Sequence, residues 1–148
     1  MTGPAFAHRD AIEQSLELAA ERCADLTPLV YARLFARLPH SQALFARDTT
    51  GAIRGEMLAR VFMAILDYVG ERRYAQQMIG SEAVTHSYYD VPTEEFGVFF
   101  EVLAETLAEV LGADWSEAFD TAWRRLLYEL DLYVKNGSQP LAQVAAAL

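Results

Sequence analysis

The chain has 148 residues, of which 53% are hydrophobic, so it can form one domain around a single core. Its net charge of −9 argues against binding to nucleic acid or to an anionic membrane surface, because both require clustered Lys and Arg. No apolar run approaches the roughly 20 residues that span a bilayer, and no basic and then apolar leader opens the chain. The one cysteine, Cys23, cannot form an internal disulfide. These features predict a cytoplasmic protein that contacts neither nucleic acid nor membrane.

Apolar residues recur at helical spacing along most of the chain, which predicts α-helices rather than strands. After a flexible arm at residues 1–8, a first helix is expected at about residues 9–22. A second helix is expected at about residues 27–37, with Thr27 as its cap. A short helical turn then opens with a proline and covers residues 39–45.

The middle of the chain is predicted to hold one long helix and one irregular segment. A loop at residues 46–51 precedes the long helix, which ends at the break around residues 70–73. The stretch from about Tyr74 to Tyr89 has a thin apolar face, so we expect it to be less regular. His86 lies in this stretch, shortly before a proline.

Two strongly amphipathic helices are predicted in the last third of the chain. Thr93 is expected to cap the first of them, and Gly112 stops it. The second begins around Asp114 and Glu117 and ends near residue 136, which leaves residues 138–148 as a possible tail. Because no segment alternates with a period of two, the sequence predicts a single all-α domain over residues 1–148, a globular helical sandwich of six to eight helices.

Glu101, Glu105 and Glu109 recur at spacing four, opposite the apolar stripe of their helix. This spacing indicates a solvated acidic face far more than a metal site. Among the histidines, His8 lies in the arm and His40 follows a proline at a corner, so both are expected at the surface. His86 stays open on its own pattern, since a lone helical histidine is more often exposed or satisfied than a ligand.

The order and spacing of several other residues bear on the role of His86. The stretch from Val30 to Phe45 contains tyrosine, phenylalanine and proline at set positions, and an alanine–tryptophan pair lies in the last helix. The ordered set is Tyr31, Pro39, Phe45, Arg54, Leu58, His86, Phe96 and Trp123. This combination resembles the globin family, specifically the bacterial single-domain globins and the haem domains of flavohaemoglobins. The resemblance covers roughly residues 9–135, and it implies a globin-like helical sandwich.

The resemblance implies a haem b whose iron is held by His86. A neutral imidazole binds the iron from one side of the porphyrin and leaves the opposite side open for a diatomic gas. The implied haem-binding residues are Phe45, Arg54, Leu58, His86, Val91 and Phe96. Tyr31, Arg54 and Leu58 are the implied ligand-binding residues, with the Tyr31 hydroxyl directed at bound gas. On the residues alone, Tyr31 also fits a core-edge tyrosine that bonds a backbone carbonyl.

Three positions depart from the family pattern. Arg54 stands where glutamine or histidine is usual, and it can bond the ligand, reach a haem propionate or remain a solvated helix charge. Phe96 replaces a tyrosine that often links the proximal histidine to a carboxylate, which weakens the case for strong oxygen activation. Glu82 replaces an apolar residue one turn before His86, so we expect either that it faces outward or that the helix is locally irregular.

These features predict a globin that binds oxygen, nitric oxide or carbon monoxide reversibly, for storage, delivery or sensing, as a monomer or homodimer. A different class of function is nitric oxide dioxygenase or peroxidase chemistry, which needs a separate reductase because this chain is too short to include one. A third class is a haem-free globin-fold module in signalling or protein interaction, in which His86 is incidental. The sequence leaves open whether the protein is an enzyme.

Overall fold

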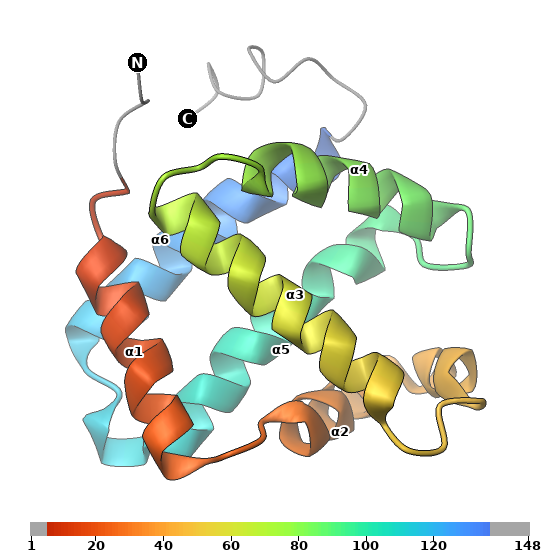
Figure 1. Ribbon diagram of the computed structural model, residues 1–148, viewed down its shortest axis with the longest axis horizontal. Helices are drawn as coiled ribbons and strands as arrows, with labels where there is room; N and C mark the ends of the chain where they lie inside the picture. The colour runs from red at the N-terminus through yellow and green to blue at the C-terminus, as the bar shows by residue number, and fades with distance from the viewer. Residues whose placement is uncertain (1–5, 137–148) are drawn as a thin grey trace.

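The computed structural model describes residues 6–136 (Figure 1). Within this range the chain forms six α-helices and two short 3₁₀ helices, and no strand. In chain order they are α1 (Arg9–Arg22), α2 (Thr27–Arg37), η1 (Pro39–Phe45), α3 (Ala52–Val69), α4 (Ala75–Ser87), α5 (Thr93–Leu111), η2 (Gly112–Asp114) and α6 (Glu117–Lys135). The predicted all-α fold is confirmed.

α5 and α6 pack against each other, and the other helices are arranged around this pair. α1 contacts both of them, α2 packs on α5, and α4 packs on α6 and α5. In Figure 1, α3 runs diagonally in front of the other helices, from beside α2 towards the start of α4. Contacts of α3 with α2, α1 and α4 hold it there. α2 and α4, which are far apart in the sequence, therefore both pack against α5.

The core is built mainly on α5, because buried residues lie on more than one side of this helix. They are Phe100, Val102, Leu103, Ala104, Thr106, Leu107 and Leu111. The polar member, Thr106, donates its hydroxyl to the backbone carbonyl of Val102 at 2.8 Å, so it adds no unsatisfied group. A second buried hydrogen bond, 2.9 Å from Trp123 Nε1 to Ser15 Oγ, links α6 to α1.

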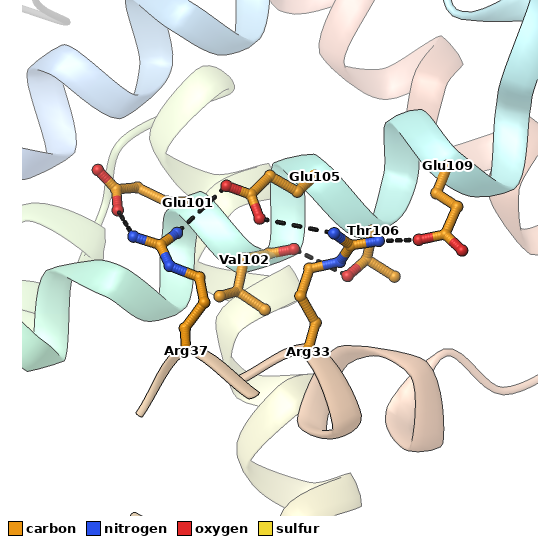
Figure 2. A network of polar contacts seen from close by, with 7 residues as sticks. All are labelled: Arg33, Arg37, Glu101, Val102, Glu105, Thr106 and Glu109. Atoms are coloured by element: carbon orange, nitrogen blue, oxygen red, sulfur yellow. Dashed lines mark hydrogen bonds and ion pairs between the residues drawn. The ribbon is translucent and has the colours of Figure 1, made fainter. Parts of the chain in front are cut away.

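Ion pairs line the contact between α2 and α5 (Figure 2). Arg37 binds Glu101 at 3.0 Å and Glu105 at 3.2 Å, and Arg33 binds Glu105 at 3.7 Å and also Glu109. The predicted acidic face of α5 is therefore covered in part by two arginines of α2. Each exposed pair contributes only about 0–1 kcal/mol, and Glu105 is shared by the two arginines, so the network adds modestly to the packing of α2 on α5.

The prediction that Thr27 and Thr93 cap their helices is wrong by one position. Each is the first residue of its helix, and neither helix start is capped by a side-chain hydrogen bond from the preceding residue. The N–H of Thr27 is bound at 3.0 Å by Asp25, which forms a turn two residues earlier. Ser116 caps α6, with its hydroxyl accepting from the N–H of Phe119 at 3.1 Å.

The prediction of an irregular segment around His86 is also wrong, since α4 is an uninterrupted α-helix from Ala75 to Ser87. Its buried residues are Ala75, Ile79, Gly80 and Ala83. Three of these four are small, so the helix approaches its neighbours closely with little apolar surface. A periodicity search weights large apolar side chains, and it therefore underestimates a helix of this kind.

Within the predicted arm at residues 1–8, Phe6 is buried and its ring lies 6.2 Å from that of Tyr68. The rest of the arm up to residue 5 and the predicted tail at residues 138–148 lie outside the described residues. None of the helices within residues 6–136 is long and apolar enough to cross a membrane.

Candidate functional site

His86 lies near the end of α4 with its side chain 28% exposed. Its Nδ1 lies 2.8 Å from the backbone carbonyl oxygen of Glu82, one turn earlier. Because a carbonyl oxygen can only accept, Nδ1 must carry the hydrogen, and in the neutral ring Nε2 then keeps its lone pair. This is the tautomer that a histidine needs in order to bind a metal through Nε2, with its other nitrogen held by a backbone carbonyl.

The turn after α4 and the start of α5 both contact His86. The Phe96 ring on α5 lies 4.9 Å from the His86 ring. Val91 donates its N–H to the His86 carbonyl at 3.1 Å, across a turn in which Asp90 has a φ of 65°. The structure therefore brings together three of the predicted site residues, His86, Val91 and Phe96.

Tyr31 lies in the middle of α2 and is almost completely buried. Its ring contacts those of Phe45 at 5.3 Å and Phe99 at 5.7 Å. Among the described residues, its hydroxyl is the buried side-chain polar atom without a hydrogen-bond partner. The alternative in which this hydroxyl bonds a backbone carbonyl is therefore wrong. A buried hydroxyl without a partner is destabilising. Its presence here fits a site in which a bound ligand supplies the missing hydrogen-bond partner.

Burial raises the pKa of the Tyr31 hydroxyl, with the positive charge of Arg54 opposing the rise and the negative charge of Asp48 adding to it. The net effect is a raised pKa, so this hydroxyl keeps its proton at neutral pH. It can then donate a hydrogen bond, but it cannot act as a base.

α5 connects the Tyr31 and His86 sides of the candidate site. Phe96 contacts His86, and Phe99, one turn further along the same helix, contacts Tyr31. Three residues of α-helix rise about 4.5 Å, so the two aromatic contacts are closely spaced on one rigid element. α2 and α4 are thereby held in a fixed relation to each other.

Of the remaining apolar site residues, Phe45 packs beside Tyr31, whereas Leu58 lines a hollow that Tyr31 does not line. Phe45, at the end of η1, is half-buried and packs on Phe35 with a ring distance of 5.8 Å. Leu58 on α3 is buried and lines a hollow of about 330 Å³ together with Leu16 and Phe62. A second hollow, of about 600 Å³, is lined by Tyr31, Phe35, Arg54 and neighbouring polar residues.

Arg54 lies in the first turn of α3, and its side chain is bound to Asp48 in the preceding loop. Nε of Arg54 donates to the Asp48 carboxylate at 3.0 Å, and Nη2 donates to the Asp48 backbone carbonyl at 3.0 Å. The sequence pattern indicated only that Asp48 lies in a loop. The signal that could have identified its role is an acidic residue shortly before a helix start.

Glu82 provides the other interaction that the sequence pattern did not reveal. Glu82 lies in regular helix, and its side chain is 45% exposed. Of the two expected alternatives, the outward-facing side chain is therefore the one observed. Its carboxylate nevertheless lies 3.5 Å from His86 Nδ1. The Glu82 carboxylate therefore lies beside the imidazole, although Phe96 has no hydroxyl that could link the imidazole to a carboxylate.

No three His, Cys, Asp or Glu side chains gather to hold a metal ion anywhere in residues 6–136. The described residues thus offer the single nitrogen of His86 rather than a cage of protein ligands. One protein ligand suffices for iron only when a porphyrin supplies four more. The chemistry of this donor set fits a haem and does not fit a bare ion.

The family model for globins matches residues 29–131, a range that includes every candidate site residue. The chain belongs to the globin family. This finding agrees with the resemblance to globins that the sequence pattern carried. It also agrees with the all-α architecture, which was derived from the periodicity without reference to any relative.

Curated relatives of this globin match at low identity. The chain is 26% identical to an uncharacterised globin-like protein of Aquifex aeolicus (strain VF5), covering 87% of this chain and 94% of that protein. It is 24% identical to leghemoglobin-1 of Vicia faba, covering 76% of this chain and 83% of that protein. No solved structure matches.

A buried tyrosine elsewhere in this globin provides a contrast to Tyr31. The Tyr68 hydroxyl, on α3, donates to the buried carboxylate of Glu129 on α6. Arg125 donates to the other oxygen of Glu129 at 2.6 Å, and the Arg72 guanidinium lies over the Tyr68 ring at 4.3 Å. Here every polar group has a partner, as is usual for structural hydroxyls in a core.

We predict opposite stability effects for removal of these two hydroxyls. Tyr31→Phe should leave the free energy of unfolding unchanged or raise it by up to about 1 kcal/mol, because it removes an unsatisfied group. Tyr68→Phe should lower it by about 1.5–3 kcal/mol, because the buried Glu129 carboxylate loses a donor. Urea denaturation of the haem-free protein measures both. A loss of more than about 1 kcal/mol in Tyr31→Phe, the value of one ordinary hydrogen bond, would show that its hydroxyl has a structural partner.

Proposed function

We propose that this globin holds haem b through Nε2 of His86 and binds a diatomic gas reversibly in the pocket that contains Tyr31. The observation that carries the proposal is the hydrogen bond from His86 Nδ1 to the Glu82 carbonyl, which leaves Nε2 able to bind iron. Bound haem would supply an iron site open to oxygen, nitric oxide or carbon monoxide. Storage, delivery and sensing of such a gas all require this one reversible step.

Within the proposed pocket, each residue has a distinct task. Phe96 packs on the His86 ring and restricts its rotation. Phe45 packs its ring on that of Tyr31 and provides an apolar wall, while Tyr31 keeps a proton available to a ligand that carries partial negative charge. A hydroxyl donor favours oxygen over carbon monoxide, because more negative charge develops on bound oxygen.

We expect the purified protein to show a haem absorption band that responds to reduction by dithionite and to carbon monoxide, and His86→Ala to lose that response. The physical reason is that alanine has no nitrogen with which to bind the iron. Absorption spectra of the ferric, reduced and carbon-monoxide forms measure this. His40→Ala is the matched control, since His40 is an exposed histidine whose ring pairs with Glu95 at 2.8 Å. A colourless protein even after haem addition would support a haem-free interaction module.

Tyr31→Phe should release oxygen at least about tenfold faster than the unsubstituted protein, because a charge-assisted hydrogen bond contributes about 1.5–3 kcal/mol. Release of carbon monoxide should change much less, which makes it an internal control for general damage to the pocket. Stopped-flow displacement of each gas measures the two rates. Equal acceleration for both gases would mean that Tyr31 acts through packing and not through its hydroxyl.

A second candidate function, nitric oxide dioxygenase or peroxidase chemistry, is favoured by the position of Glu82. A carboxylate 3.5 Å from His86 Nδ1 makes the imidazole a stronger electron donor, the property that supports oxygen activation. Such chemistry needs repeated reduction by a separate reductase. Reversible binding needs only the haem and the pocket, so it remains the first proposal.

Mixing the oxygenated protein with nitric oxide and a chemical reductant distinguishes the two functions. We expect nitrate to form no faster than the chemical reductant returns the iron to the ferrous state, and equally fast in Glu82→Gln, as for a reversible binder. Repeated nitrate production that falls in Glu82→Gln would instead establish an enzyme in which the carboxylate beside His86 takes part. Glu94→Gln, an exposed acidic residue in the first turn of α5, is the control for the change in net charge.

A further inference from the structure

Asp48 is an almost completely buried acid in the loop before α3, with its side chain 3% exposed. Its carboxylate accepts the backbone N–H groups of Ile53 at 3.1 Å and Arg54 at 3.0 Å. It also accepts Nε of Arg54 at 3.0 Å, while its own backbone carbonyl accepts Arg54 Nη2. Asp48 thus holds both the start of α3 and the guanidinium of Arg54.

The Arg54 guanidinium has room for a different position. Its side chain is 28% exposed and lines the hollow of about 600 Å³ that Tyr31 also lines. Gly51, which has a φ of 81°, lies next to it and has no side chain; a Cβ at that position would lie 3.5 Å from Nη2, an ordinary contact distance. The hydrogen bonds to Asp48, and not tight packing on every side, therefore determine where the positive charge lies.

The two charges act on the Tyr31 hydroxyl in opposite directions. Burial raises the pKa of Tyr31, while Arg54 lowers it and Asp48 raises it. The same paired charges keep the pKa of Asp48 low: burial alone raises it, but the N–H groups of Arg54 and Ile53 and the Arg54 guanidinium outweigh that. Asp48 is therefore ionised at neutral pH, and the pair adds almost no net charge to the Tyr31 pocket.

We propose that Asp48 is a positioning residue that pairs with Arg54 at the wall of the Tyr31 pocket and keeps its guanidinium from turning towards a bound ligand, so that the site selects neutral diatomic gases over small anions such as azide. The inference rests on the proposed haem ligation by His86. An arginine released into the pocket would attract an anionic ligand, and its charge acts more strongly in a buried site than in water. Asp48 thus acts on the ligand through Arg54 and touches neither ligand nor haem.

The experiment is a double-mutant cycle with azide as the probe. Azide affinity of the ferric protein is measured by absorbance titration for the unsubstituted chain, Asp48→Asn, Arg54→Gln and the combined variant. Through-space effects of fixed charges add, so an arginine that does not move gives the same Asp48→Asn effect in both backgrounds. We expect Asp48→Asn to tighten azide binding about tenfold when Arg54 is present and at most about threefold when it is Gln.

Asp67→Asn is the matched control for the capping role. The Asp67 carboxylate accepts the N–H groups of Arg73, Tyr74 and Ala75 before α4, much as Asp48 does before α3, but it accepts no arginine side chain. We expect azide affinity to stay unchanged in Asp67→Asn. The infrared stretching band of carbon monoxide is a second readout: it should shift in Asp48→Asn, and it should not shift when Arg54 is also replaced.

A third readout does not need haem. The Arg54 Nε–H should exchange slowly with water in the unsubstituted protein and rapidly in Asp48→Asn, as followed by nitrogen-15 NMR. Equal azide effects in both backgrounds, or rapid Nε–H exchange in the unsubstituted protein, would overturn the role of Asp48 while leaving haem ligation intact. Failure of the protein to bind haem at all would overturn the proposed function and, with it, the ligand selectivity.

Discussion

The structure depends on the burial of α5, which carries apolar side chains on more than one side and is packed by α1, α2, α4 and α6. The burial of this helix fixes the positions of α2 and α4, which are far apart in the sequence. Phe96 and Phe99 extend from the same helix to His86 and to Tyr31, one turn apart. The two halves of the candidate site come from α2 and α4. Their relative position is therefore set by the burial of apolar side chains around α5, a rigid helix, although the hydrophobic effect itself has no direction.

The polar groups inside this globin divide into two kinds. Tyr68, Glu129 and Arg125 satisfy one another and join α3 to α6, so their cost of burial is offset within the protein. Tyr31 is buried to the same degree but has no partner. Sites at which a protein leaves a local rule unfulfilled are where function is expected, because an unsatisfied buried group costs stability that a ligand can restore. The contrast between two buried tyrosines locates the candidate site independently of any relative.

Helical periodicity sufficed to predict where most helices lie. The bounds of α1, α2 and η1 agree with the apolar spacing and with the positions of Pro28 and Pro39. The method failed at α4, where burial of alanine and glycine leaves no large apolar stripe. It also misplaced the caps at Thr27 and Thr93, because Asp25 accepts the N–H of Thr27 and because the helix at Thr93 begins directly after Pro92, which offers no side-chain acceptor. These are failures of local detail, and none of them changes the packing of the core.

The residues of the candidate site could be proposed from the sequence, but the interactions among them could not. The ordered combination from Tyr31 to Trp123 indicated the family, and His86 and Phe96 do lie together. The carbonyl of Glu82 and the carboxylate of Asp48 could not be identified in this way, since their roles depend on side-chain direction and on backbone geometry. A family resemblance assigns roles to residues at positions that match the family pattern. It assigns no role to a residue, such as Asp48, that lies outside that pattern.

The pair of Asp48 and Arg54 illustrates that limit. Arginine at this position departs from the family pattern, and taken alone it would put a full positive charge beside the hollow that Tyr31 lines. The compensating residue lies only six positions earlier, yet its carboxylate reaches Arg54 because the loop turns through Gly51 and returns the chain to the start of α3. The chemistry of a distal residue therefore cannot be assigned from its identity. It depends on the partner that holds the side chain, and in this chain that partner also begins the helix on which the arginine lies.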